Sequence, residues 1–266
     1  MRPSGWAAAV LAVLVALGGC ARKDAMLARL RAIDDNRARE VVSDALWGGG
    51  SMFAWAGHQT LRLEIAWTDH APPDGRTHNE VWWLDTVGGR LRIESPEARE
   101  VAVFDGLTWR VLVDGRETDD LVRRAEAAGR GMMLRQLATL PFSLLDPDAK
   151  IMYVGTRTVP AEAKAWNRLF VTYAGGAFYE PGDRLVVEVN CDTRRIDTVG
   201  LCWAETPFLG GDWRVDMDEW FPAGDLVLSR RWRFTPVNQA GDATGPMRWT
   251  VRVTGVALDV PAEPPR

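Results

Sequence analysis

The chain has 266 residues, a formal charge of −4 at neutral pH and 47% apolar residues. The length suffices for one large domain, and the apolar fraction suffices for a sizeable core. Because the charge is slightly acidic and the basic residues form no cluster, the composition argues against a nucleic-acid-binding protein.

The first 20 residues predict a targeting segment. Arg2 precedes an uncharged apolar run from Trp6 to Leu17. A membrane-spanning helix needs about 20 apolar residues, so this shorter run fits the core of a signal peptide. The run ends at Gly18-Gly19 and meets Cys20, after which the chain becomes charged.

Leu17-Gly18-Gly19-Cys20 resembles the lipobox of bacterial lipoproteins. The resemblance implies that residues 1–19 are removed and that Cys20 receives a diacylglycerol and a further acyl chain. Two or three chains anchor a protein to a membrane firmly, whereas one holds it only marginally. No Asp follows Cys20 directly, which under the sorting rule of proteobacterial lipoproteins favours the periplasmic side of the outer membrane. The alternative is an ordinary signal peptide with an incidental cysteine.

Apolar residues then recur at helical spacing from residue 24 to 47, which predicts one helix that stops at Gly48-Gly49-Gly50. After it the period changes to two. Alternating residues predict strands in "LRLEIAW", "VWWLDT", "RLRIES", "EVAVF" and "LTWRVLV".

A second helix is predicted from Leu121 to Leu140, ended by Pro141. It carries two adjacent apolar stripes and contains Gly129 and Gly131 beside two methionines. Gly weakens a helix and Met adapts to varied shapes, so a flexible lid is one interpretation, but a helix break with Met in an ordinary core is the favoured one. The candidate pocket residues are Leu121, Ala125, Met132, Met133, Leu137 and Phe142.

Five or six further strands follow, in "KIMYVGTR", "WNRLFVTYA", the 185–203 hairpin, "DLVLSRRWRF" and "MRWTVRVTGVALDV". A tight turn at Thr193-Arg194 would place Cys191 opposite Ile196 and Cys202 opposite Leu185. The two sulfurs would then lie about 20 Å apart along the sheet, too far for a disulfide. We therefore expect two free, buried thiols.

The element order predicts a mainly β (α+β) fold. About ten antiparallel strands must curl, and the apolar face of the sheet needs a cover, which the two helices can supply. The sequence shows no internal repeat and no linker, so residues 20–260 are expected to form one domain and 261–266 a disordered tail.

The chain resembles the LolA/LolB-like lipoprotein-carrier superfamily. The resemblance rests on the N-terminal helix, "VFDGLTWRVL", the helix before "LPFSLLDP", and "LVVEVNCDTRRIDTV". It implies a half-barrel whose concave face, roofed by helices, holds acyl chains, and it brings no catalytic residues. The family's outer-membrane acceptor exposes an apolar loop tip, for which Phe208 and Leu209 are the candidate.

The loop "WTDHAPPDGRTHNE" contains Asp69, His70, Asp74 and His78, which are possible ligands of a divalent metal. A solvated, Pro/Gly-rich hairpin tip explains the loop better, because spacings such as HExxH and CxxC are absent. The sequence also lacks a G-x-S-x-G elbow and a dinucleotide-binding loop. We therefore predict a non-enzyme without metal or cofactor.

These patterns together predict a membrane-anchored envelope lipoprotein that binds a lipid or an acylated protein in a half-barrel cavity. Two alternatives remain open. One is a non-catalytic binding or scaffold lipoprotein whose concave face is filled by its own side chains. The other is a hydrolase or metal-binding protein that uses residues 69–78.

Overall fold

The structure is a computed structural model that describes residues 20–71, 75–174, 182–203 and 211–260. The predicted signal peptide, the predicted tail and the candidate loop tip at Phe208 and Leu209 lie outside these ranges. In the described part of the chain, no helix has the length and apolar character needed to cross a membrane.

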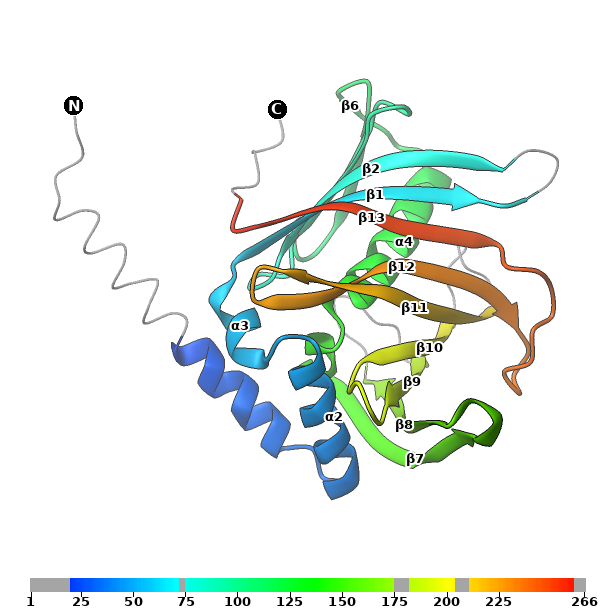
Figure 1. The fold of residues 1–266 in the computed structure, drawn as a ribbon. Helices are drawn as coiled ribbons and strands as arrows, with labels where there is room; N and C mark the ends of the chain where they lie inside the picture. Colours follow the sequence, from blue (N-terminus) through cyan, green and yellow to red (C-terminus); the bar gives the residue numbers. More distant parts are fainter. Residues whose placement is uncertain (1–19, 72–74, 175–181, 204–210, 261–266) are drawn as a thin grey trace, which may run out of the picture.

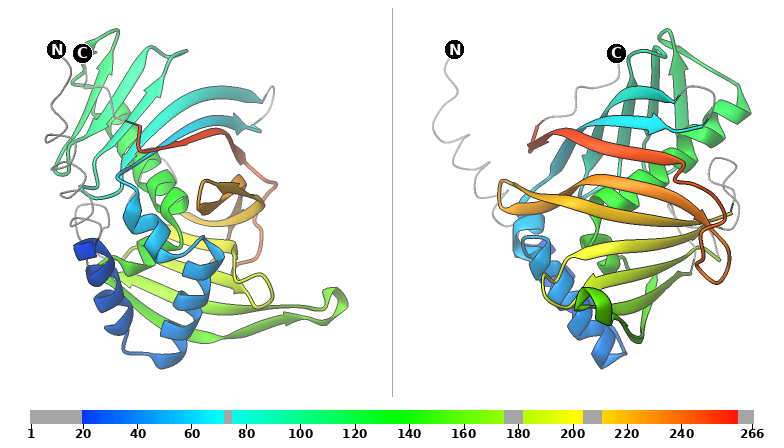
Figure 2. Two further views of the ribbon diagram at one scale, coloured as in Figure 1. Left: turned by 60° about the vertical axis from the view of Figure 1, so that its left-hand side comes forward. Right: turned by 45° about the vertical axis from the view of Figure 1, so that its right-hand side comes forward.

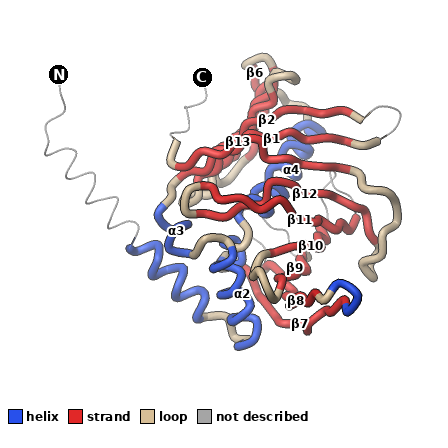
Figure 3. Tube along the Cα trace, in the orientation of Figure 1, coloured by secondary structure: helices blue, strands red, loops and turns tan. Residues whose placement is uncertain are grey.

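The described chain begins with helices that precede the first strand (Figure 3). They are residues 20–31, α2 (Asn36–Gly48) and α3 (Met52–Gly57). The prediction of one helix over residues 24–47 is therefore wrong, although its end at Gly48 is confirmed.

Asp35 explains the break between the first two helices. One of its carboxylate oxygens accepts hydrogen bonds from the backbone N–H groups of Arg37 and Ala38, which makes Asp35 the N-cap of α2. The other oxygen accepts from the backbone N–H of Tyr153, at 2.8 Å. The same side chain thus starts α2 and attaches it to a distant strand.

The rest of the domain is one antiparallel sheet of thirteen strands, interrupted by a long helix, α4 (Leu121–Thr139), and the short η1 (Phe142–Leu145). Six strands precede α4: β1 (Thr60–Asp69), β2 (Arg76–Asp85), β3 (Leu91–Ser95), β4 (Glu100–Phe104), β5 (Trp109–Val113) and β6 (Arg116–Glu117). Seven follow it: β7 (Ala149–Val159), β8 (Lys164–Tyr173), β9 (Arg184–Asn190), β10 (Ile196–Trp203), β11 (Gly211–Ala223), β12 (Leu226–Val237) and β13 (Trp249–Leu258). The turn η2 (Pro160–Glu162) joins β7 to β8.

The strand order is β6-β5-β4-β3-β2-β1-β13-β12-β11-β10-β9-β8-β7. Each half is a meander of neighbouring strands, and the pairing of β1 with β13 joins the two halves. The sheet curls around α4 without closing, because β6 and β7 form its two edges (Figures 1 and 2). The predicted curled half-barrel is confirmed, and β6 and β11 are strands that the sequence pattern did not identify.

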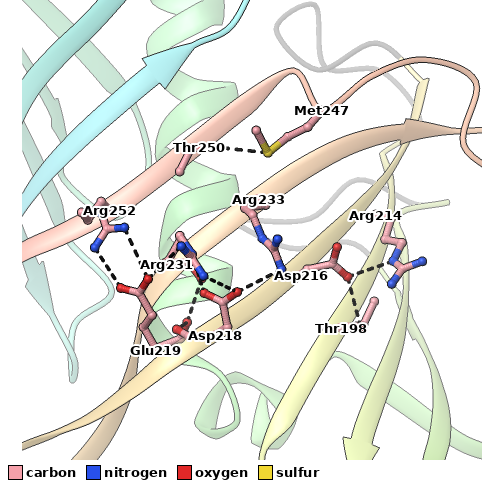
Figure 4. Close-up of polar contacts among 11 residues, drawn as sticks. Thr198, Arg214, Asp216, Asp218, Glu219, Arg231, Arg233, Met247, Thr250 and Arg252 are labelled. Carbon is pink, nitrogen blue, oxygen red and sulfur yellow. Dashed lines mark hydrogen bonds and ion pairs between the residues drawn. The ribbon is translucent and has the colours of Figure 1, made fainter. Parts of the chain in front are cut away.

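The two faces of the sheet differ in chemistry. In β1, Leu61, Leu63, Ile65 and Trp67 are buried on the concave side and alternate with partly exposed residues. On the outer side, charged residues pair across strands: Arg231 contacts both Asp218 and Glu219, and Glu219 also contacts Arg252 (Figure 4). The apolar side chains of β1 therefore face the concave side, and this cluster of ion pairs lies on the outer side.

The β9–β10 hairpin corrects the predicted turn. Five residues, 191–195, connect the strands, and the Asn190 side chain accepts hydrogen bonds from the backbone N–H groups of Asp192 and Thr193. Leu201 rather than Cys202 lies opposite Leu185. Cys191 and Cys202 are unbridged, as predicted, but the prediction that both are buried is wrong, since Cys191 is exposed and Cys202 half-buried.

His58 joins three distant segments of the chain. It follows α3, and its two ring nitrogens each lie 2.7 Å from a carboxylate, that of Asp225 after β11 and that of Asp259 after β13. Partial burial alone would lower the pKa of His58, but the hydrogen bonds to both carboxylates and their charges outweigh burial and raise this pKa. Only the protonated ring can donate to both partners at once.

We expect the free energy of unfolding to fall as the pH rises through the folded-state pKa of His58. Because the pKa of His58 is raised in the folded state, the protonated ring stabilises the fold. This contribution to the free energy of unfolding is complete at a pH below the unfolded-state pKa, about 6.5, and is lost at a pH above the folded-state pKa. Since both carboxylates are substantially exposed, the loss should be about 1 kcal/mol. Denaturant titrations of the wild type and His58→Gln over about pH 5.5–9 test this. If the free energy of unfolding changes equally with pH in the two proteins, the pH dependence comes from groups other than His58.

Candidate functional site

Helix α4 lies across the concave face of the sheet (Figures 1 and 2). Asp120 caps its start by accepting from the backbone N–H groups of Val122 and Arg123. The helix ends at Thr139, one residue before its predicted end. Its middle approaches the sheet closely, because a Cβ at Gly131 would lie 2.1 Å from the Trp109 ring. This contact therefore requires a glycine. The sequence pattern had indicated Gly131 only as a source of helix flexibility.

The six predicted pocket residues lie in different environments. Met133, Leu137 and Phe142 are almost completely buried, and the Phe142 ring stacks on Trp55 with the centroids 4.6 Å apart. Met132 and Ala125 are half-buried. Leu121, in the first turn of α4, is 76% exposed. The contact with the sheet is therefore made by the second half of α4 and by η1.

An ionic network also holds the middle of α4 to the sheet. Glu80 of β2 is 4% exposed and accepts hydrogen bonds from the indole N–H of Trp82 and the hydroxyl of Ser95, both at 2.9 Å. Arg130 of α4 lies 3.4 Å from Glu80 and 3.2 Å from Glu100 of β4. The guanidinium thus connects α4 to two strands. The sequence could have indicated that Glu80 faces the concave side, because it alternates in step with Trp82 and Leu84, which face inward.

A cavity of about 10 Å³ lies between the second half of α4 and the sheet. It is lined by Leu63, Leu137, Ala138, Leu140, Met217, Trp220, Leu228, Ser229, Trp232 and Val253. At this place the buried side chains of α4, among them Leu137 and Ala138, pack against the sheet where the sequence predicts a ligand.

Two tryptophans at this cavity carry unused donors. Neither the indole N–H of Trp220 nor that of Trp232 has a hydrogen-bond acceptor among the described residues. Trp232 is 2% exposed. A buried donor without a partner costs about 1–3 kcal/mol, so an acceptor atom that reached either N–H group would be stabilised. Neither residue was among the predicted pocket residues.

An aromatic cluster also lines the concave face. Trp213 stacks on Trp249 with the centroids 4.5 Å apart, and Trp67 and Phe234 pack against Trp249. These side chains come from β1, β11, β12 and β13, and they are at least nine-tenths buried. The concave face is therefore apolar well beyond the part that contacts α4.

The loop considered for metal binding is engaged in other contacts. Asp69 pairs with Arg248, and His70 Nε2 lies 2.9 Å from the Thr250 hydroxyl. His78 lies 3.9 Å from Glu97. Asp74 lies outside the described residues. Among the described residues, no three His, Cys, Asp or Glu side chains come together as a metal site.

No protein-family model and no curated protein matches this sequence. Solved structures do match its fold. A domain from Vibrio parahaemolyticus, described as that of an outer membrane lipoprotein-sorting protein, gives a TM-score of 0.55 at 9% identity, covering 84% of this chain and 93% of its own. A DUF1329 family protein from Desulfovibrio piger gives 0.54 at 10% identity, covering 85% and 95%. The chain thus shares its fold with these two solved structures, and this fold is the curled half-barrel with helices that its sequence predicts.

Proposed function

We propose that this protein is a cell-envelope lipoprotein that binds an apolar ligand, a lipid or the acyl chain of an acylated protein, between the concave face and α4. The observation that carries the proposal is a separate amphipathic helix seated inside an open, apolar half-barrel. The similarity in fold to a lipoprotein-sorting domain supports it. The proposed role is binding rather than catalysis.

Binding requires α4 to move, because the space beneath it measures only about 10 Å³. An acyl chain would replace the apolar contacts that Met133 and Leu137 now make. Burying about ten methylenes stabilises the complex by roughly 8 kcal/mol. The loss of freedom on binding costs several kcal/mol, and displacement of α4 costs more. The expected affinity is micromolar or weaker, which suits a carrier that must release its ligand.

The unpaired indole donors support an ester-containing ligand. A displaced α4 would leave Trp220 and Trp232 beside the incoming chain, and an ester carbonyl is an acceptor for both N–H groups. A plain hydrocarbon would leave the donors unpaired. Acylated ligands should therefore bind more tightly than alkanes of the same length.

The filled interior also supports a second candidate, a binding or scaffold lipoprotein that holds no ligand under α4. The two candidates differ in one experiment. Full-length protein carrying Cys20→Ser is purified, examined by native mass spectrometry for retained lipid and titrated with a fluorescent fatty-acid ester. Retained lipid or saturable binding supports the carrier. Absence of both supports the scaffold.

We propose that the protein is anchored through Cys20, which is exposed. Cys20 begins the helix of residues 20–31, and the first turn of this helix contacts the rest of the domain. The Arg22 guanidinium donates to the backbone carbonyls of His58, at 2.6 Å, and Thr86, at 2.8 Å. Lys23 lies over the ring of Phe53, itself 47% exposed. An acylated Cys20 would therefore hold α3 close to the membrane surface, on the periplasmic side of the outer membrane.

We expect Cys20→Ser to move the protein from the membrane fraction to the soluble fraction, because the acyl chains supply the anchoring free energy. Intact-mass measurement of the wild type should show the acyl increment. Cys191→Ser is the matched control and should stay in the membrane fraction. Retention of Cys20→Ser on membranes after a salt wash would contradict the anchor.

A further inference from the structure

On the outer face of strands β7 to β10, three apolar side chains and a glycine form a row. This row lies on the side of the sheet opposite to the core. The register places Met152 opposite Phe170, Phe170 opposite Val186, and Val186 opposite Gly200. Met152 is 52% exposed, and the other three are half-buried. The row crosses three inter-strand steps, about 14 Å in all. The neighbouring residues Leu169, Leu185, Val187 and Val199 face the opposite side and belong to the core.

Phe170, Val186 and Gly200 of this row form the floor of a hollow on the outer face. The hollow measures about 710 Å³, within the usual range for small-molecule sites. Phe170, Val186 and Gly200 line it, and the segment from Val237 to Gly241 after β12 forms a wall. Gly200 leaves the floor open, since its place in the row carries no side chain.

Arginines surround this floor. Arg157, Arg168, Arg184 and Arg214 line the hollow together with two carboxylates, Glu188 and Asp212, which leaves a formal charge of +2. Arg157 holds Glu188 through two hydrogen bonds of 2.9 and 2.7 Å. Arg214 uses its Nε for Asp216, as Figure 4 shows. The rim therefore has more cationic than anionic groups around an apolar centre.

We propose that this outer groove is a second binding site, for a single-tailed amphiphile with an anionic headgroup, a carboxylate or a phosphate monoester. The apolar row accommodates the tail. The headgroup is placed near β10, where Arg214 of β11 lies opposite Gly200 and Arg184 of β9 lies opposite Cys202 in the register. Guanidinium groups bind both types of headgroup strongly. The sheet separates this site from the space under α4, so the two can be tested independently.

Cys202 provides a local readout of occupancy. It lines the groove, whereas Cys191 is exposed and lies outside the groove lining. Burial, followed by the hydrogen bond to Asp212, raises the pKa of the Cys202 thiol. Alkylation of Cys202 is therefore slow. Occupancy of the groove is measured as the ratio of the Cys202 alkylation rates with and without ligand. Cys191 in the same sample is the internal control.

The experiment follows N-ethylmaleimide labelling of Cys202 and Cys191 in full-length Cys20→Ser protein. The probes are dodecanoate and dodecyl phosphate, with dodecanol and dodecyltrimethylammonium as neutral and cationic controls, all below micelle-forming concentrations. A probe at about nine times its Kd should slow Cys202 labelling about tenfold and leave Cys191 unchanged. Dodecanol should protect less, and the cation least.

Two variants test the two halves of the site. Gly200→Leu fills the floor without a clash, because the nearest atom to its Cβ is Val186 Cβ at 3.4 Å, and it should abolish protection by every probe. Arg214→Gln should weaken protection by the anionic probes about tenfold and leave dodecanol unchanged. Arg130→Met, on the other side of the sheet, should leave Cys202 protection as in the wild type.

Three results would overturn the proposal. Equal protection by dodecanol and dodecanoate would remove the anionic specificity. Equal slowing of Cys191 and Cys202 would show non-specific adsorption. Protection that persists in Gly200→Leu but changes in Arg130→Met would place the ligand under α4, which would support the carrier function while removing the outer site.

Discussion

In Arg130→Met, the free energy of unfolding should fall by about 2 kcal/mol while the affinity for acyl ligands rises. Breaking a buried ion pair costs about 3–5 kcal/mol when one charge is left alone. Here the loss is smaller, because Glu80 keeps its hydrogen bonds from Trp82 and Ser95, and Arg130 itself is 19% exposed. Denaturant titration measures the first effect.

The rise in affinity follows from the need to displace α4. A ligand that binds only the displaced state loses affinity in proportion to the population of that state. Since the Arg130 network stabilises the seated helix, its removal should tighten binding of a fluorescent fatty-acid ester about tenfold for each 1.4 kcal/mol that it contributed. A scaffold with a filled core would lose stability without any gain in binding.

Arg124→Met is the matched control. Arg124 lies on the same helix but pairs with Glu117 and Asp119, both on the surface. Surface pairs contribute about 0–1 kcal/mol, so stability and acyl binding should remain close to the wild type. If Arg130→Met behaves like Arg124→Met in the denaturant titration, the buried network does not hold α4 in place.

Gly50→Ala should destabilise the domain by about 3 kcal/mol. The backbone φ of Gly50 is 103°, a conformation that costs an L-residue about 1–2 kcal/mol. An added Cβ would also lie 2.4 Å from the backbone oxygen of Asp225 and 2.8 Å from the Cα of Leu226. Backbone atoms cannot move aside as a flexible side chain can, and overpacking adds about 1–3 kcal/mol.

Gly57→Ala is the control for this substitution. It lies in the last turn of α3, and nothing approaches within 4 Å of its added Cβ. Ala is a better helix former than Gly, so this variant should be as stable as the wild type or slightly more stable. Thermal and denaturant unfolding of both variants provide the comparison. Equal stability of the two would mean that the α2–α3 connection at Gly50 and the β11–β12 turn are farther apart than the structure shows.

The three glycines Gly48-Gly49-Gly50 end a helix and also allow distant segments to pack closely against it. The sequence predicted correctly that Gly48-Gly49-Gly50 ends a helix. The structure adds that Gly48 lies against the backbone of Arg194 and Gly49 against Pro141. The close approach of α2 to these segments could not be predicted, because it depends on residues far away in the chain.

The sequence by itself determined the features that depend on neighbouring residues. Period-two alternation identified most strands, helical spacing identified α4, and Pro141 marked its end. These patterns are reliable because each is produced by contacts within a few residues. The overall half-barrel followed from the number of strands, since a long antiparallel sheet must curl and cover its apolar face.

Only the tertiary structure decided which distant groups meet. The β9–β10 register depended on the Asn190 hydrogen bonds in a five-residue loop, and the burial of both thiols was predicted wrongly for that reason. The strand alternation could not show whether α4 fills the concave face, because filling depends on the volumes of side chains from opposite elements. The outer groove likewise exists because four strands align in one register, which places Phe170, Val186 and Gly200 in a row between arginines.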